Sequence, residues 1–234
     1  VGIVGSYGLR NQQVSWDGLP YPSTVVPGRE LGRNYFLGGP YVFGAPTSML
    51  ICADEVRKRS AFYNVANLHT DIEACLDILR DRDYGFVHQV LTFTREHAEA
   101  ESTSFHKRFG TGYLGWFEHL SAYGRAYLSE EEYEVCTRQC WNQYYKFLAS
   151  HSMFYKKQKG FWEFHKKELG KLGSSLSYGK LAGAVWLETV ELALNPLNTW
   201  RRIARRMARL RNQNDQSLPE KQPMAETPTR TLAQ

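Results

Sequence analysis

The amino-acid sequence predicts an α/β fold that is followed by a mostly helical extension. Three short runs, at 1–7, 47–52 and 86–94, have the apolar or alternating pattern of strands. At 68–80, apolar residues recur every three or four positions, as in an amphipathic helix. From about residue 104 the spacing becomes helical, so we expect strands and helices to alternate only in the first half of the chain.

The chain begins with a buried strand and a long loop. Residues 1–7 read VGIVGSY, a β-branched run bounded by glycines. Residues 8–39 are rich in Gly, Pro, Asn and Ser, which predicts a loop with one short helix at 29–37. Long ordered loops usually carry function. Trp16 and Tyr21 are aromatic residues of this loop that could stack on a sugar ring, although a loop tryptophan also commonly serves as an anchor.

A second strand and a short helix precede the helix at 68–80. The strand at 47–52 is followed by a short helix at 53–59. We expect Thr70 or Asp71 to be the N-cap of the helix at 68–80, because either side chain can accept a hydrogen bond from the first turn.

Helices account for the rest of the ordered chain. Ser129 is the expected N-cap of a helix whose first turn, 130–132, is acidic. Further helices are expected at 161–172 and from 177 to about 193. The predicted organisation is a sheet-bearing part at 1–110, a helical extension at 111–211 and a disordered polar tail at 212–234.

The composition is that of a soluble globular protein. Of the 234 residues, 42% are hydrophobic and 23% charged, and no run approaches the roughly 18 apolar residues of a membrane-spanning helix. No secretory signal is recognisable, which predicts a cytoplasmic location. The four cysteines are too few for a disulfide framework, and Cys136 and Cys140 lack the further ligands of a zinc site, so reduced thiols are expected.

Three segments, taken in order, carry a family resemblance. They read GGPYVFGAPTSMLI, LHTDIEACLDIL and LTFTREHAEAES. Together they resemble bacterial family 2 glycosyltransferases of the GT-A fold, in which a Gly-x-Pro-Thr strand entrance precedes a helix that opens with an acidic residue. A strand ending in Arg-x-His follows in that family. The resemblance covers about residues 1–104 and implies an incomplete GT-A-like mixed sheet.

The resemblance implies an inverting sugar transfer. Such enzymes move a sugar from a nucleoside diphosphate sugar to a saccharide or lipid-linked acceptor, and surface polysaccharide synthesis is the expected setting. A hydroxyl is a poor nucleophile, so a carboxylate near the anomeric carbon takes its proton during the attack. By its place in the motif, Asp71 is the candidate base. Read from the residues alone, an acidic residue at a helix start is more often a cap.

The other candidate site residues come from the same motifs. Gly44, Pro46 and Thr47 are expected to shape the floor of the acceptor pocket, with Gly44 allowing a close approach. Arg95 could pair with phosphate, or instead with Glu99. The resemblance also makes His97 a candidate metal ligand or diphosphate contact, and His69 a substrate-side residue at a position where family members commonly have an acidic one.

The sequence departs from the family by an absence. The uridine-binding strand and the Asp-x-Asp metal motif of the family are not found, and Asp81-Arg82-Asp83 follows a helix, as a turn does. We therefore expect the main ligands of a Mn or Mg ion in an N-terminal half that precedes this chain. On that view the chain is a fragment that by itself does not bind the donor.

A basic amphipathic segment lies near the C-terminus. Residues 197–211 include TWRRIARRMARLR, with arginines on one face and Trp200, Ile203, Met207 and Leu210 on the other. Such a helix suits an anionic membrane surface, which would place the protein peripherally on the inner face of the membrane. A solvated helix packed through its apolar stripe is an equal alternative. Nucleic acid is not an expected partner, because the interleaved aromatic residues of such sites are missing.

Two other functions remain open from the sequence. One is a non-catalytic, membrane-associated interaction module derived from a transferase fold. The other is a hydrolase or nuclease that uses Asp71, Glu73 and His97. Glu73 lies two positions after Asp71 and should point from a different face of the helix, which disfavours the second.

Overall fold

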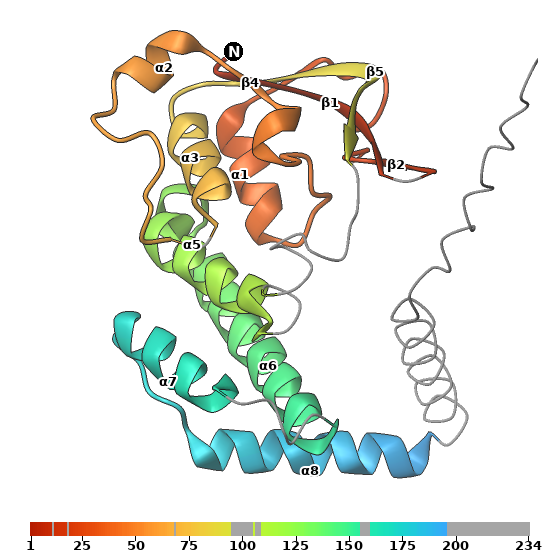
Figure 1. The fold of residues 1–234 in the computed structure, drawn as a ribbon, viewed down its shortest axis with the longest axis vertical. Coiled ribbons are helices and arrows are strands. Elements are labelled where there is room, and N and C mark those ends of the chain that lie inside the picture. Colours follow the sequence, from red (N-terminus) through yellow and green to blue (C-terminus); the bar gives the residue numbers. More distant parts are fainter. Residues whose placement is uncertain are drawn as a thin grey trace, which may run out of the picture. The chain divides into compact units, whose positions relative to one another are not determined.

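A computed structural model describes residues 1–10, 12–17, 19–67, 69–94, 105, 109–154 and 160–195. The chain divides into two compact units, Val1–Val185 and Trp186–Gln234, which are described separately. The larger unit is mixed α/β, as the sequence predicts, with a curled mixed sheet at its N-terminal end and helices after it (Figure 1).

The sheet is built around its first strand. β1 pairs in parallel with β5 on one side, and on the other side it pairs antiparallel with β4 near its start and with β2 near its end. β3 pairs antiparallel with the outer edge of β5. The strands are β1 (Ile3–Arg10), β2 (Gln13–Ser15), β3 (Val25–Val26), β4 (Leu50–Ile51) and β5 (Tyr84–Thr94).

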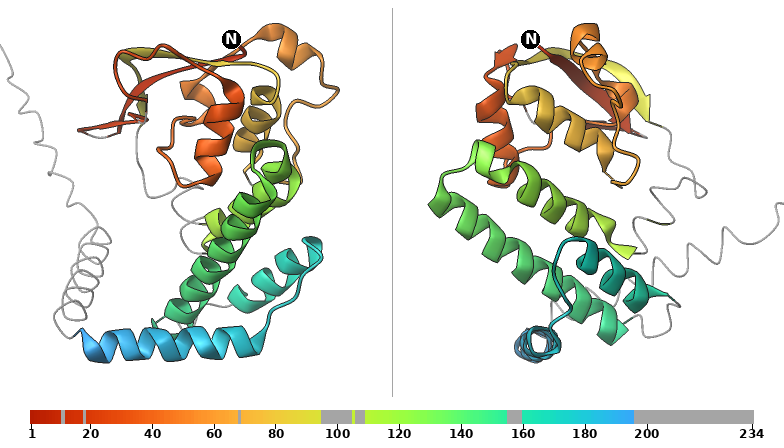
Figure 2. Two further views of the ribbon diagram at one scale, coloured as in Figure 1. Left: turned by 180° about the vertical axis from the view of Figure 1, so that it is seen from behind. Right: turned by 90° about the vertical axis from the view of Figure 1, so that its left-hand side faces the viewer.

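Two helices, α1 (Gly28–Phe36) and α3 (Thr70–Leu79), lie against the same face of the sheet, as both views in Figure 2 show. Tyr84 of β5 is buried between the layers and its Oη donates a hydrogen bond to the Val42 carbonyl, 2.7 Å away. The core around it is closed by large apolar side chains from the sheet, both helices and the segment between them: Ile3, Phe36, Phe43, Leu76 and Leu79.

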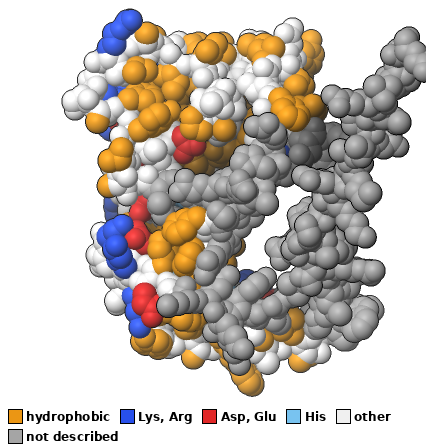
Figure 3. All heavy atoms as spheres, viewed as in Figure 1, with side chains coloured by type: hydrophobic (Ala, Val, Ile, Leu, Met, Phe, Trp, Pro, Cys, Tyr) orange, Lys and Arg blue, Asp and Glu red, His pale blue; other side chains and the backbone are white. Residues whose placement is uncertain are grey.

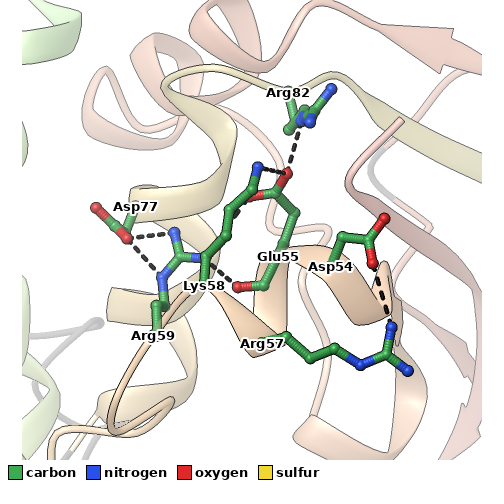
Figure 4. Close-up of polar contacts among 7 residues, drawn as sticks. All are labelled: Asp54, Glu55, Arg57, Lys58, Arg59, Asp77 and Arg82. Atoms are coloured by element: carbon green, nitrogen blue, oxygen red, sulfur yellow. Dashed lines mark hydrogen bonds and ion pairs between the residues drawn. The ribbon is translucent and has the colours of Figure 1, made fainter.

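A salt-bridge network attaches the short helix α2 (Ala53–Arg57) to the end of α3. Glu55 is buried, and Figure 4 shows its carboxylate between Lys58 and Arg82, with Nζ and Nε at 2.8 and 2.7 Å. These hydrogen bonds lower the pKa of Glu55 to about 2. Arg59 bridges the same carboxylate and Asp77 of α3. Arg82 thus has a structural partner, in accord with reading Asp81-Arg82-Asp83 as a turn.

The remaining helices form a second core. Its members come from α5 (Thr111–Tyr127), α6 (Glu130–Phe154) and α7 (Phe161–Lys171), together with the start of α8 (Tyr178–Leu194). The capping prediction is confirmed. Ser129 Oγ accepts a hydrogen bond from the backbone N–H of Glu132, and the Glu132 carboxylate accepts one from the backbone N–H of Ser129. Over the part of the chain described, no helix has both the length and the apolar character needed to cross a membrane.

The expectations for 8–39 and 47–52 were partly wrong. β1 extends to Arg10 and turns back as β2, so the predicted loop begins with a hairpin. The predicted strand at 47–52 is a two-residue strand after a 3-10 turn, Pro46–Ser48. Proline fixes a helical φ at the start of that turn, and the Ser48 hydroxyl accepts a hydrogen bond from the Ala45 backbone at 3.3 Å, which favours the turn over an extended chain.

Candidate functional site

Asp71 lies in the first turn of α3 and is half-buried. The N-cap prediction was wrong, because His69 is the N-cap residue and no side chain caps the helix. The chain just before the helix is instead fixed by Asn67, whose Oδ1 accepts a hydrogen bond from the backbone N–H of His69 at 2.8 Å. Relieved of a capping role, the Asp71 carboxylate is available for other chemistry.

The three carboxylates of α3 differ in their partners. Glu73 accepts hydrogen bonds from the side chains of Asn64 and Asn67, and Asp77 pairs with Arg59. Within the described residues, Asp71 has neither an ion-pair partner nor a side-chain hydrogen bond. The lack of a partner in the part of the chain that the structure describes sets Asp71 apart from the other two carboxylates of the helix.

The charge of Asp71 acts on two tyrosines and a cysteine. Burial raises the pKa values of Tyr35 and Tyr41 above their usual range, and the negative charge of Asp71 raises both further. The pKa of the Cys75 thiol is raised by the same two causes. Cys75 contacts Met49 through their sulfur atoms, 3.5 Å apart, which links α3 to the segment after the Gly-x-Pro-Thr motif. Asp71 therefore lies within electrostatic range of these three groups.

Tyr41 also bonds to the predicted Gly-x-Pro-Thr motif, residues 44–47. Gly44 adopts φ 71°, a left-handed conformation that favours glycine, and its carbonyl accepts a hydrogen bond from Tyr41 Oη at 3.2 Å. Pro46 and Thr47 are exposed on the turn that follows. Tyr41 donates a hydrogen bond to Gly44, and the negative charge of Asp71 raises the pKa of Tyr41. Tyr41 is thus the residue that relates the Gly44 turn to Asp71.

Trp16 packs against the same turn in a strained backbone conformation. Its φ of 63° is unusual for a residue with a side chain. Its ring lies 5.7 Å from that of Tyr41, and a Cβ on Gly8 or Gly44 would lie 2.5 or 3.5 Å from it. The buried Nε1 of Trp16 finds no acceptor among the described residues. A strained, incompletely satisfied tryptophan beside the turn is a candidate for ligand contact.

His69 is fixed by a histidine from α5. His119 Nε2 lies 3.2 Å from the His69 carbonyl and therefore donates to it, so Nδ1 of the neutral ring accepts from Tyr35 Oη, also at 3.2 Å. Burial lowers the pKa of His119 to about 4, which keeps the ring neutral. The His69 ring packs on Gly115, where a Cβ would lie only 2.1 Å from it. These contacts hold the residue that starts α3.

The remaining predicted site residues are not placed with this group. Arg95, His97 and the basic segment 197–211 lie outside the described residues. Across the described ranges, no three His, Cys, Asp or Glu side chains come together as a metal site. A cavity of about 320 Å³ at the start of α5 is lined by Tyr113, Trp116, Gln143 and their neighbours, and Asp71 is not among its lining residues.

Sequence reasoning missed several residues of the site. Tyr35 comes from α1 and His119 from α5, and neither belongs to a recognisable motif; Tyr41 lies within the first of the three segments but was not singled out there. The clustering of aromatic residues in 35–43 was the one available signal, and it does not by itself separate a site from a core.

No protein-family model matches the chain, and comparisons with curated proteins and with solved structures found no similar protein. The family resemblance therefore stays a prediction from the sequence motifs.

Proposed function

We propose that this chain forms the acceptor side of an inverting family 2 glycosyltransferase, with Asp71 as the general base. One observation carries the proposal: on α3, Asp71 is the carboxylate without a partner among the described residues, and its charge raises the pKa values of Tyr35 and of Tyr41, which bonds to the Gly44 turn. Structural carboxylates of the same helix are engaged by Asn or Arg. A base that must receive a proton from a substrate benefits from having no competing donor.

In the proposed reaction, an acceptor hydroxyl oxygen attacks the anomeric carbon of the donor sugar. The bond from that carbon to the nucleoside diphosphate breaks as the new glycosidic bond forms, and the hydroxyl proton passes to Asp71. Tyr41 and Trp16 would flank the acceptor and exclude water, since both rings lie at the Gly44 turn. The acceptor is a saccharide or a lipid-linked saccharide.

Binding of the nucleoside diphosphate sugar is assigned to residues outside the ranges that the structure describes. A divalent cation, Mn or Mg, would neutralise charge on the diphosphate leaving group. Arg95 and His97 remain the proposed diphosphate and metal contacts from this chain. The mixed sheet is the coarse feature that the structure shares with the proposed fold, and Leu50 of β4 and Phe93 of β5 leave apolar surface exposed on it, at 76% and 64%.

The test uses the polypeptide that the native gene encodes. It is incubated with Mn²⁺, a panel of uridine, guanosine and thymidine diphosphate hexoses, and lipid-linked or free saccharides. Transfer is followed by release of the nucleoside diphosphate, and the anomeric configuration of the product is read by NMR. We expect one donor to be used with inversion. Retention of configuration, or no transfer from any donor, would overturn the proposal and favour the interaction module.

A further inference from the structure

The last turns of α8 expose large apolar side chains in the smaller unit. Trp186, Leu187 and Leu194 are 68%, 68% and 74% exposed. At 100° per residue these three share one half of the helix surface with Val190 and Ala193. Figure 3 shows apolar side chains along this helix. Such a group of exposed apolar residues marks an interaction surface.

Few charges accompany the exposed apolar side chains. Of the two carboxylates in these turns, Glu188 lies on the opposite side of the helix and is only 4% exposed, whereas Glu191 is half-buried and lies beside Leu187 at the edge of the apolar group. The apolar surface thus has one carboxylate at its edge and none within it. Tryptophan next to leucines is also the composition found at the level of lipid headgroups.

The charge of the residues that follow α8 indicates the charge of the partner. Residues 197–211 contain six arginines and no acidic residue, giving a formal charge of +6 against +5 for the whole chain. An anionic surface is therefore attracted to the region where the apolar side chains are exposed. A second copy of the chain would be repelled there, and three side chains fall short of the roughly 800 Å² per partner that a stable interface buries.

We propose that Trp186, Leu187 and Leu194 of α8 insert into the headgroup region of an anionic lipid surface, to which the arginines of 197–211 draw the chain. This inference is independent of the transferase reaction, because it needs neither donor nor Asp71. It extends the sequence prediction, which considered only 197–211, to a described helix.

The test is co-sedimentation of the full chain with vesicles of phosphatidylcholine alone or with 30% phosphatidylglycerol. We expect binding to the anionic vesicles that falls at least tenfold in the variant Trp186→Ser/Leu187→Ser/Leu194→Ser. A matched control, Val65→Ser/Phe93→Ser, replaces residues that are 97% and 64% exposed elsewhere and should bind as the wild type does. Circular dichroism melting confirms that both variants are folded.

A second measurement locates the tryptophan. Lipids brominated in the acyl chain should quench the fluorescence of the wild type more than that of Trp186→Phe. The proposal is overturned if the triple variant binds like the wild type, if both vesicle types bind equally, or if bromolipids quench the two proteins equally. It is also overturned if light scattering shows a dimer that the triple variant abolishes, because a second copy would then be the occupant.

Discussion

Asp71 differs from its neighbours in its surroundings more than in its position. Its helix also carries Glu73 and Asp77, whose oxygens are engaged by side chains from outside the helix. The sequence motif pointed to Asp71 through its order between the Gly-x-Pro-Thr turn and the Arg-x-His strand. The charge of Asp71 adds a physical link to the Gly44 turn, since it raises the pKa values of Tyr35 and Tyr41.

Gly44 provides a prediction at the same scale. We expect Gly44→Ala to lower the free energy of unfolding by about 1–3 kcal/mol, because φ 71° is unfavourable for alanine and the new Cβ would lie 3.0 Å from Ser48 Cβ. Gly38→Ala is the matched control, with φ 81° but open space around the Cβ, and should lose about 1 kcal/mol. Urea unfolding of both variants measures the difference; equal losses would mean that Ser48 does not confine the turn.

The sequence could predict only part of this site. Asp71 and Gly44 could be named as candidates because each lies in a local motif with a fixed residue order. Tyr35 and His119 are brought to the start of α3 by the packing of α1 and α5 against it, and the sequence spacing does not encode that packing. His69 was expected as a substrate-side residue, and the structure adds its role at the start of α3.

At the scale of elements, helices were predicted better than strands. The helix that begins at Glu130 was located by its Ser129 cap and acidic first turn, which are local signals. β2 and β4, of three and two residues, exist only because β1 pairs with them. Their own sequences are too short for a periodic pattern, which explains why the expectations for 8–39 and 47–52 were incomplete.

The packing of α5 on the start of α3 is testable with a pair of glycines. Gly115→Ala should destabilise the protein by about 1–3 kcal/mol and shift His69, because the added Cβ would lie 2.1 Å from the imidazole ring. Gly112→Ala in the same helix meets nothing within 4 Å and should be neutral or stabilising by up to about 1 kcal/mol. Thermal unfolding and the NMR signals of His69 provide the readouts. Similar behaviour of the two variants would argue against this packing.

At the scale of the larger unit, each of the two cores contains a buried histidine. His119 lies in the first and His165 in the second, where Tyr144 Oη bonds to its Nδ1 at 2.9 Å. Burial lowers the pKa of each to about 4. An unfolded histidine binds a proton near pH 6.5, so at lower pH the unfolded state takes up protons that the folded state does not.

Stability should therefore fall as the pH falls from about 6.5 to about 4. The expected loss is on the order of 1–2 kcal/mol per histidine at pH 5, measured by urea unfolding at pH 7.5 and pH 5. His119→Gln and His165→Gln should each be less stable at pH 7.5 and should each remove part of the pH dependence. A pH dependence that both variants retain in full would show that these histidines are not its source.

The proposed reaction is tested most directly by comparing two substitutions on one helix. In the polypeptide that the native gene encodes, Asp71→Asn keeps the shape of the side chain but removes its ability to accept the acceptor proton. Asp77→Asn, about two turns along α3, disrupts the ion pairs with Arg59 and Arg80 instead. We expect kcat for sugar transfer to fall about 10²–10⁴-fold for Asp71→Asn and less than about threefold for Asp77→Asn, with both proteins folded. Transfer by Asp71→Asn at the rate of Asp77→Asn would contradict the assignment of Asp71 as the base.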